Sequence, residues 1–356
     1  MNLEELRGKI DKVDREIVDR LNERVRLAAE IGQLKNQHDE PLYVPAREEE
    51  VFQKLSELSD GPLEEGPLRA IYREIISASI ALEKKLIIGY LGPEATFTHQ
   101  AAIRNFGSSL DYKPLNTIGE VFEEVERGDC DYGVVPIENS TEGAVFHSLD
   151  MLVETDLTVI AQVYLPIRHC LISRHPLGEI ESVLSKDQAL GQCRDWLRRN
   201  LADAQLVPVA STSLAVDRAK NEPNAAAIAS HLAAQLRGLP VVVEDVQDRK
   251  ENVTRFLVIG PKAPARREDA NYKTSVVLSV KDKVGALQEA LAPFSDRNLN
   301  LSKIESRPSR RKAWDYYFFV DFLGHRDDDL VSDALSELER TCPFVKCLGS
   351  YPDIVA

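Results

Sequence analysis

Residues 132–145 read YGVVPIENSTEGAV, and this stretch decides how the middle of the chain is interpreted. The apolar residues 133–137 predict a short buried strand, and Asn139, Ser140 and Thr141 follow at the expected start of a helix. These side chains are common helix N-caps, so one such junction says little. The unpaired N–H groups and the dipole of a helix start nevertheless favour an anion there.

The order of strand, polar residues and helix occurs five times between residues 86 and 262. The five strands are predicted at residues 86–92, 133–137, 182–185, 206–210 and 225–229. Such alternation predicts an α/β fold, and ligands of open parallel sheets bind beyond the carboxyl ends of the strands. We therefore expect the five polar ends to converge on one small anionic ligand, although ordinary capping alone would also explain them.

Motifs that are missing narrow the chemistry of this segment. Neither GxGxxG nor GxxxxGK[ST] follows a strand, which disfavours dinucleotide and P-loop chemistry. No GxSxG nucleophile elbow occurs either. His169 lies in the apolar run PIRHCLI, and we interpret it as a packed strand residue rather than a ligand or base.

Composition and charge limit the partners. The 356 residues carry a net charge of −14, which argues against binding to nucleic acids or anionic membranes. No run is long enough to span a bilayer, and the N-terminus lacks the apolar core of a signal peptide. The five cysteines have no metal-ligand spacing. We therefore expect a cytoplasmic protein with reduced thiols, no metal and no cofactor.

The first 85 residues predict three helices. Apolar residues recur at helical spacing from Leu3 to about Leu34, and further helices are expected at about residues 46–58 and 63–85. The first helix would be roughly 45–50 Å long, more than a small lone domain can cover, which favours a partner chain along it.

Cations on this first helix could bind a small dianion. Arg24 and Lys35 are about three turns and roughly 16 Å apart on one face. Arg7 lies about 25 Å from Arg24 on a different face, so an antiparallel partner helix would have to supply it. Solvated charges on a helix surface are the alternative.

The stretches LRGKIDKVDREIVDRLNERVRLAAEIGQLK, AREEEV and IISASIALE resemble the all-helical chorismate mutase domain, over residues 1–86. The resemblance implies a dimer with interlocked sites, in which Lys35 and Glu83 take part in catalysis. The implied site residues are Arg7 from the partner, Arg24, Lys35, Arg47, Glu48, Ser79 and Glu83. Cations that hold both carboxylates of chorismate, with a donor to the breaking ether oxygen, suffice for a pericyclic rearrangement.

Two positions depart from the bacterial pattern. Val44 stands where an Asp often occurs and removes one polar contact, which leaves a vestigial mutase as an alternative. Glu83 stands where a Gln often occurs and can donate to an ether oxygen only when protonated. We therefore expect a mutase rate that falls as pH rises through the pKa of Glu83.

The stretches GYLGPEATFTHQAA, VVPIENSTEGAV, HCLIS, LSKDQALGQCRDWL, ASTSLAV and NVTRFLVIG resemble prephenate dehydratase, over residues 87–262. The resemblance implies two α/β lobes around a cleft, as in periplasmic binding proteins, with Thr254 as the catalytic residue and Arg255 as a carboxylate clamp. The implied cleft residues are Thr96, Asn139, Ser140, Thr141, Ser185, Gln192, Thr212, Arg255 and Phe256.

A Pro-rich, charged linker at residues 260–269 precedes the last segment. Residues 273–351 follow the order βαββαβ, which predicts a ferredoxin-like domain. The motifs around Gly285 and Glu305 resemble those of phenylalanine-sensitive ACT regulatory domains. The resemblance implies L-phenylalanine between the ACT domains of two subunits, bound by Gly285, Ala286, Leu287, Glu305, Ser306, Arg307 and Pro308.

Together these resemblances predict a bifunctional chorismate mutase–prephenate dehydratase of phenylalanine synthesis. Chorismate would be converted to prephenate and then to phenylpyruvate by a homodimer or dimer of dimers inhibited by L-phenylalanine. The alternative is a non-catalytic sensor of a small anion, which explains the strand ends and the ACT domain. It does not explain Arg24, Lys35 and Glu83, or the sequence Thr254-Arg255-Phe256.

Overall fold

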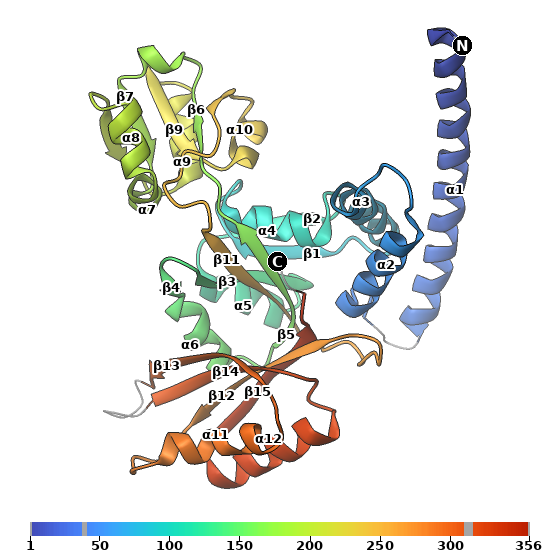
Figure 1. The fold of residues 1–356 in the computed structure, drawn as a ribbon, viewed down its shortest axis with the longest axis vertical. Coiled ribbons are helices and arrows are strands. Elements are labelled where there is room, and N and C mark those ends of the chain that lie inside the picture. The colour runs from blue at the N-terminus through green and yellow to red at the C-terminus, as the bar shows by residue number, and fades with distance from the viewer. Residues whose placement is uncertain (1, 38–40, 310–315, 355–356) are drawn as a thin grey trace. The chain divides into compact units, whose positions relative to one another are not determined.

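The computed structural model describes residues 2–37, 41–309 and 316–354, which form two compact units (Figure 1). Unit 1 comprises residues 1–87 and 105–111, and unit 2 comprises residues 88–104 and 112–356. Unit 1 carries the three N-terminal helices, whereas unit 2 contains three sheets.

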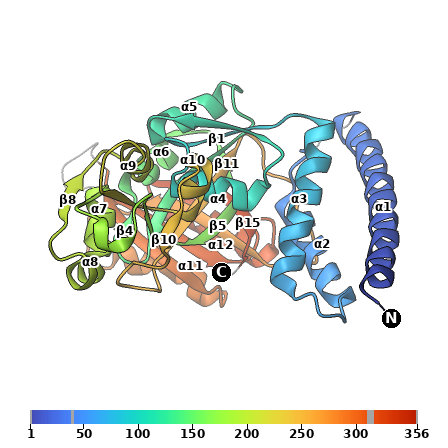
Figure 2. The same ribbon diagram turned by 90° about the horizontal axis from the view of Figure 1, so that it is seen from above.

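The helices of unit 1 agree with the predicted pattern. They are α1 (Leu3–Gln37), α2 (Pro45–Leu58) and α3 (Glu65–Glu83). Pro45 opens α2, where its missing N–H has no helical partner to lose. Figure 2 shows α3 alongside α1 and α2, and it packs against both. The N-terminal half of α1 leaves its apolar stripe exposed, including Leu3, Ile10 and Val13.

Unit 2 begins with an α/β lobe, here called lobe 1. Its sheet has the order β2-β1-β3-β11-β5, with β4 paired to β3, and β1 runs parallel to β3 while β11 is antiparallel to both neighbours. The elements are β1 (Ile87–Leu91), α4 (Phe97–Phe106), β2 (Asp111–Leu115), α5 (Ile118–Glu126), β3 (Tyr132–Asn139), β4 (Gly143–Ala144), α6 (Phe146–Glu154), β5 (Thr158–Pro166) and β11 (Val253–Gly260).

The second α/β lobe, lobe 2, is built on the sheet β10-β6-β9-β7-β8. Its elements are β6 (Cys170–Ile172), a 3-10 turn at Leu177–Glu179, β7 (Ser182–Ser185), α7 (Asp187–Gln192), α8 (Arg194–Asn200), β8 (Gln205–Pro208), α9 (Thr212–Ala219), β9 (Ala225–Ala229), α10 (His231–Arg237) and β10 (Val241–Val243). The central strand β9 is fully buried and reads AAAIA. Alternate residues of β9 contribute to separate cores on the two faces of the sheet.

The C-terminal domain has the predicted ferredoxin-like order. Its elements are β12 (Tyr272–Ser279), α11 (Ala286–Asp296), β13 (Leu301–Pro308), β14 (Tyr316–Leu323), α12 (Asp329–Thr341) and β15 (Phe344–Pro352). The sheet order is β13-β14-β12-β15. The third strand was predicted to begin at Trp314, which lies outside the described residues.

The connection between the lobes determines where a site can form. The chain leaves lobe 1 after β5, completes lobe 2, and returns along β11, which inserts between β3 and β5 (Figure 1). The first residues of β11 therefore lie where the chain crosses from one lobe to the other. Thr254 is the second residue of this strand.

Two predictions about the polar strand ends need correction. Asn139, Ser140 and Thr141 do not open a helix, because β3 turns back into β4 and α6 begins only at Phe146. The five strand ends also do not share one parallel sheet. Those of β1 and β3 belong to lobe 1, and those of β7, β8 and β9 belong to lobe 2.

Candidate active sites

Thr254 is held by a side chain from the neighbouring strand. Thr254 and Asn139 are register partners, and Asn139 Nδ2 donates to Thr254 Oγ1 at 2.8 Å. The orientation of the Asn139 amide is fixed because its Oδ1 accepts from Thr141 N at 2.9 Å and Glu142 N at 3.1 Å. Since Thr254 Oγ1 already accepts this bond, its own proton is available to another acceptor.

The amide of Asn139 begins a polar chain that reaches lobe 2. Asn139 Nδ2 also lies 2.7 Å from Asn252 Oδ1, and Asn252 Nδ2 donates to Gln192 Oε1 at 3.2 Å. His169 Nε2 lies 2.9 Å from the same Gln192 oxygen and must therefore be its protonated nitrogen. The chain joins residues of both lobes around the predicted site residue Gln192.

His169 was interpreted as a packed residue, and its burial, 2% exposed, agrees. No pattern in the sequence indicates its contact with Gln192. Its Nδ1 is buried and finds no hydrogen-bond partner in the described part of the chain. Burial lowers the pKa of His169, although the hydrogen bond to Gln192 opposes the shift. Its imidazole is therefore a neutral donor to Gln192.

A pocket of about 640 Å³ opens beside this chain. It is lined by Thr141, Glu142, Gln188, Gly191, Gln192, Gln247, Asp248, Arg249 and Asn252. Arg249 is exposed and makes no hydrogen bond or ion pair to any residue that the structure describes. Arg249 was not among the predicted site residues, although it lies only three positions before the run NVTRFLVIG that contains Thr254.

Other predicted cleft residues do not line this pocket, and several of their hydroxyl groups form hydrogen bonds with backbone atoms instead. Thr96 Oγ1 donates to Leu91 O at 3.1 Å, and Ser185 Oγ donates to Ile228 O at 2.6 Å. Ser140 Oγ donates to Glu251 O and accepts from Val253 N, which ties the turn after β3 to the start of β11. Thr212 is the first residue of α9 and does not line the pocket.

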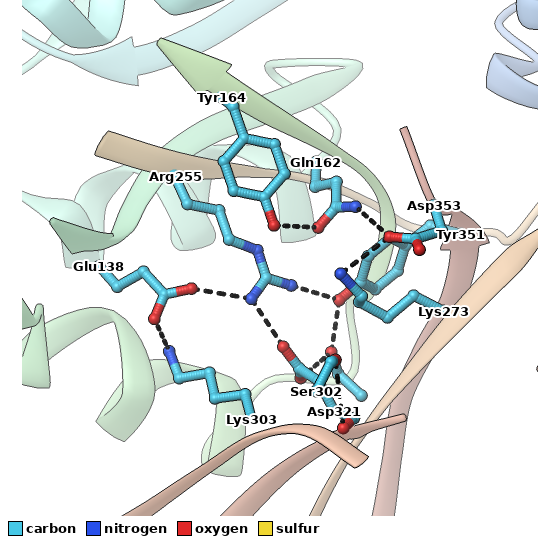
Figure 3. A network of polar contacts seen from close by, with 11 residues as sticks. Glu138, Gln162, Tyr164, Arg255, Lys273, Ser302, Lys303, Asp321, Tyr351 and Asp353 are labelled. Carbon is cyan, nitrogen blue, oxygen red and sulfur yellow. Dashed lines mark hydrogen bonds and ion pairs between the residues drawn. The ribbon is translucent and has the colours of Figure 1, made fainter. Parts of the chain in front are cut away.

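Figure 3 shows the Arg255 side chain directed toward Glu138, Asp321 and Tyr351, which argues against the predicted carboxylate clamp. Successive side chains of a strand face opposite sides, so Arg255 and Thr254 cannot share one side of β11. The Arg255 side chain is 5% exposed, and its Nη1 lies 2.6 Å from Asp321 Oδ2 and 2.9 Å from Glu138 Oε1. Phe256 is likewise placed in the core, 1% exposed, rather than in the pocket.

In unit 1 the predicted mutase residues gather in part. Arg24 Nη1 donates to Ser79 Oγ at 3.2 Å, between α1 and α3. Burial raises the pKa of Glu83, while the nearby Lys35 ammonium opposes the rise. Arg24, Lys35, Ser79 and Glu83 therefore lie on facing parts of α1 and α3.

The remaining predicted mutase residues are placed differently. Glu48 is buried and accepts a hydrogen bond from Arg73. Arg47 is paired with Glu50 on its own helix at 2.6 Å. Arg7 is exposed and makes no hydrogen bond or ion pair within the described chain.

Gly32 was not among the predicted site residues, but it lies against Glu83. A Cβ built on Gly32 would lie 2.5 Å from Cδ and 2.9 Å from Cγ of Glu83, and still closer to Oε2. A glycine inside a helix costs about 1 kcal/mol relative to alanine, so its use in α1 needs a reason. The close approach of the Glu83 carboxyl group supplies one. Val44 is the N-cap of α2 and has no side-chain capping bond.

The predicted effector residues lie at the start of α11 and on β13. Gly285 has φ +80 and precedes α11, followed by the buried Ala286 and half-buried Leu287. Arg307 is not a solvated charge, because its guanidinium binds both oxygens of Asp150 at 2.8 and 2.7 Å. Glu305, Ser306 and Pro308 share β13 with Arg307, at the edge of the C-terminal sheet.

The described residues include no cluster of three His, Cys, Asp or Glu side chains able to hold a metal ion. Among the described helices, none combines the length and apolar character that crossing a membrane requires.

Comparisons with known proteins cover all three parts of the chain. Family models match for chorismate mutase type II at residues 6–84, prephenate dehydratase at residues 88–264 and the ACT domain at residues 274–340. The bifunctional chorismate mutase/prephenate dehydratase of Aquifex aeolicus is 46% identical over 355 residues, which is 98% of each chain. That of Stutzerimonas stutzeri is 42% identical over 361 residues, covering 99% of this chain and 98% of its own.

Solved structures agree for unit 2. The prephenate dehydratase of Arthrobacter aurescens in complex with L-Phe has a TM-score of 0.70 at 35% identity, covering 76% of this chain and 93% of that one. That of Staphylococcus aureus has a TM-score of 0.65 at 29% identity, covering 75% and 100%.

A mutase-type helical unit, a two-lobed dehydratase and an ACT domain in one chain define an enzyme of aromatic amino-acid biosynthesis. The chain belongs to the family of bifunctional chorismate mutase/prephenate dehydratases. It is therefore an isomerase acting on chorismate and a lyase acting on prephenate.

Proposed function

We propose that the cleft of unit 2 converts prephenate to phenylpyruvate with Thr254 as the proton donor. The hydrogen bond from Asn139 Nδ2 to Thr254 Oγ1 carries the proposal, because it directs the threonine proton away from Asn139. A neutral threonine is a weak acid. The fixed orientation of its hydroxyl group and the surrounding amide side chains favour proton transfer from Thr254 more than water would.

The reaction needs one proton and no oxidant. The bond between the ring and its carboxylate breaks, carbon dioxide leaves, and the electron pair completes the aromatic ring as the ring hydroxyl departs. A proton from Thr254 converts the departing hydroxide to water, and solvent returns a proton to Thr254. The products are phenylpyruvate, carbon dioxide and water.

Arg249 is the side chain that we assign to the carboxylate of the pyruvyl group. It lines the pocket and has no partner among the described residues, so its guanidinium is free to bind an anion. Arg255 cannot take this role because Asp321 and Glu138 already bind it. A bond from arginine to a carboxylate is worth about 1.5–3 kcal/mol.

Replacing Thr254 by valine tests the role of its hydroxyl, because valine keeps the branched shape. We expect Thr254→Val to lower kcat for prephenate by about 10²–10⁴-fold, the range for a lost proton donor. Thr254→Ser should retain a measurable part of the rate. Conversion of chorismate to prephenate should be unchanged in both variants. Wild-type phenylpyruvate formation by Thr254→Val would refute the proposal.

The mutase site of unit 1 is proposed to be completed by a second copy of the chain. The exposed apolar stripe of α1, with Ile10 at 59% and Val13 at 53%, supports a partner helix along it. Arg7 lies about 25 Å along α1 from Arg24, so it can serve only the site of that partner. The proposed site thus combines Arg24, Lys35 and Glu83 with Arg7 of the second copy.

Mixing inactive variants tests this arrangement. In a dimer of one Arg7→Ala chain and one Arg24→Ala chain, one of the two sites has both arginines. Random exchange should therefore restore roughly a quarter of the wild-type mutase activity. Arg24→Ala mixed with Glu83→Ala should restore none, because those residues belong to one chain. Equal activity in both mixtures would contradict the shared site.

We further propose that L-phenylalanine binds at Gly285–Leu287 and at residues 305–308 and inhibits the dehydratase. The relative from Arthrobacter aurescens, which was solved in complex with L-Phe, supports this proposal. Phenylpyruvate formation from prephenate should fall with added L-phenylalanine and not with L-alanine. Replacing Gly285, whose φ of +80 disfavours a side chain, should weaken the inhibition.

A further inference from the structure

Two adjacent residue pairs link β3 and β11 at the catalytic position. Thr254 faces Asn139 in the ladder, and the next step pairs Arg255 with Glu138. Side chains alternate along both strands, so one pair faces the cleft and the other faces the opposite side of the sheet. The Glu138–Arg255 pair therefore adjoins the proposed proton donor without contacting the pocket.

The C-terminal domain binds both members of this second pair (Figure 3). Arg255 contacts Asp321 of β14 at 2.6 Å and the hydroxyl of Tyr351 of β15 at 2.7 Å. Glu138 accepts from Lys303 of β13 at 2.5 Å. Burial opposes the charge of Glu138, yet Lys303 and Arg255 together hold its pKa below the ordinary value. Each strand of the catalytic pair is thus tied to the C-terminal sheet.

The ladder between β3 and β11 is irregular at this point. Its register shifts between Arg255 and Phe256, the step that follows the Glu138–Arg255 pair. A bulge interrupts the regular backbone bonding and changes the local direction of a strand. Backbone pairing alone therefore fixes the approach of Thr254 to Asn139 less firmly than it would in a regular ladder. Side-chain bonds consequently contribute more to holding these two residues together.

Bonds other than those of Glu138 and Arg255 also attach the C-terminal domain to lobe 1. Lys346 donates to the carbonyl oxygens of Leu152 at 3.0 Å and Val153 at 3.1 Å in α6. Thr158 Oγ1 donates to Leu348 O at 3.1 Å, and Arg307 binds Asp150. Buried ion pairs contribute little net stability, so stability alone does not explain a buried Arg255.

We propose that Glu138 and Arg255 are positioning residues for the dehydratase reaction, held by Lys303 and Asp321 so that Asn139 meets Thr254. This inference rests on the proposed role of Thr254. If the inference is correct, the C-terminal domain helps to position the active-site residues even when no effector is bound. A shift of β13 or β14 would be passed directly to the two strands that carry Asn139 and Thr254.

Lys303→Met is the most direct test, because it removes one bond to Glu138 and keeps the apolar stem of the side chain. Asp321→Asn is a second variant that retains the shape at the Arg255 end. The matched control is Asp353→Asn, which breaks the pair with Lys273 of β12, 2.8 Å apart. Asp353 also accepts from Gln162 of β5, so this variant perturbs the same interface without removing a bond to Glu138 or Arg255. Prephenate turnover is measured without phenylalanine, and thermal unfolding of the same samples serves as the folding check.

We expect Lys303→Met and Asp321→Asn to lower kcat for prephenate on the order of tenfold or more, with KM nearly unchanged. Asp353→Asn and all chorismate rates should match the wild type. In a Thr254→Ser background, whose hydroxyl is already less constrained without the methyl group, Lys303→Met should cost less than in the wild type.

Three results separate the possible failures. Wild-type kcat in both variants, with Thr254→Val inactive, would overturn the positioning inference alone. Equal losses in Asp353→Asn would also overturn it, since the effect would then be general loosening of the interface. An active Thr254→Val would overturn the proposed proton donor first. Loss confined to KM would contradict positioning of Thr254.

Discussion

Replacing Gly32 by alanine should separate mutase activity from stability. The new Cβ would lie 2.5 Å from Cδ of Glu83, whereas ordinary carbon–carbon contacts are about 3.5–4.0 Å. The Glu83 carboxyl group must therefore retreat by about 1 Å. A displacement of about 1 Å in a catalytic group can cost on the order of 10²-fold in rate.

The stability of the variant should change in the opposite direction. Alanine is a better helix former than glycine by about 1 kcal/mol, and the Glu83 side chain is half-exposed and can move. The matched control is Gly66→Ala, in the same unit, where a Cβ meets nothing within 4 Å. Both variants should be at least as stable as the wild type.

The assay follows chorismate consumption by purified full-length protein, with prephenate turnover and thermal unfolding measured on the same samples. We expect Gly32→Ala to lower kcat rather than raise KM, because the role predicted for Glu83 is donation to the breaking ether bond. Gly66→Ala should retain wild-type rates. A Gly32→Ala enzyme with full mutase activity would refute the reasoning, and so would a loss of mutase activity accompanied by lower stability.

Three further changes test other parts of the two sites. Because burial raises the pKa of Glu83 despite Lys35, its proton is present below that raised pKa and is lost above it. The mutase kcat/KM should therefore fall as pH rises, and Glu83→Gln should give a flat profile at the same pH values. Arg249→Gln should raise KM for prephenate about tenfold or more with kcat retained, whereas Lys250→Gln, outside the pocket lining, should not. Val44→Asp supplies the missing N-cap of α2, so unit 1 should gain about 1 kcal/mol, and an unchanged melting temperature would contradict this.

The spacing of apolar residues was sufficient to predict elements whose structure depends on neighbouring residues in the sequence. The apolar spacing of residues 3–34 predicts α1, and the alternation after residue 272 predicts the βαββαβ order, both of which the structure contains. The turn after Asn139 was missed because its return strand, β4, has only two residues, Gly143 and Ala144. A strand of that length has no readable period.

The sequence is enough to predict which side of the strand the Arg255 side chain faces, but not which residues surround it there. Adjacent residues on a strand face opposite sides, so the sequence already separates Arg255 from Thr254. What covers the far side depends on Asp321 and Tyr351, which are 66 and 96 positions away in the sequence. No local pattern reports such contacts. The same limit applies to His169, whose partner Gln192 comes from another element.

The bonds of the C-terminal domain described above all go to lobe 1, to β3, β5, β11 and α6. Gln192, which lines the pocket, belongs to α7 of lobe 2. A change in the C-terminal sheet therefore acts first on Asn139 and Thr254, and only indirectly on the groups that hold substrate from lobe 2. Inhibition through this domain should consequently lower kcat for prephenate more than it raises KM. Steady-state rates at several phenylalanine concentrations measure the two effects separately, and a pure KM effect would place the coupling in lobe 2 instead.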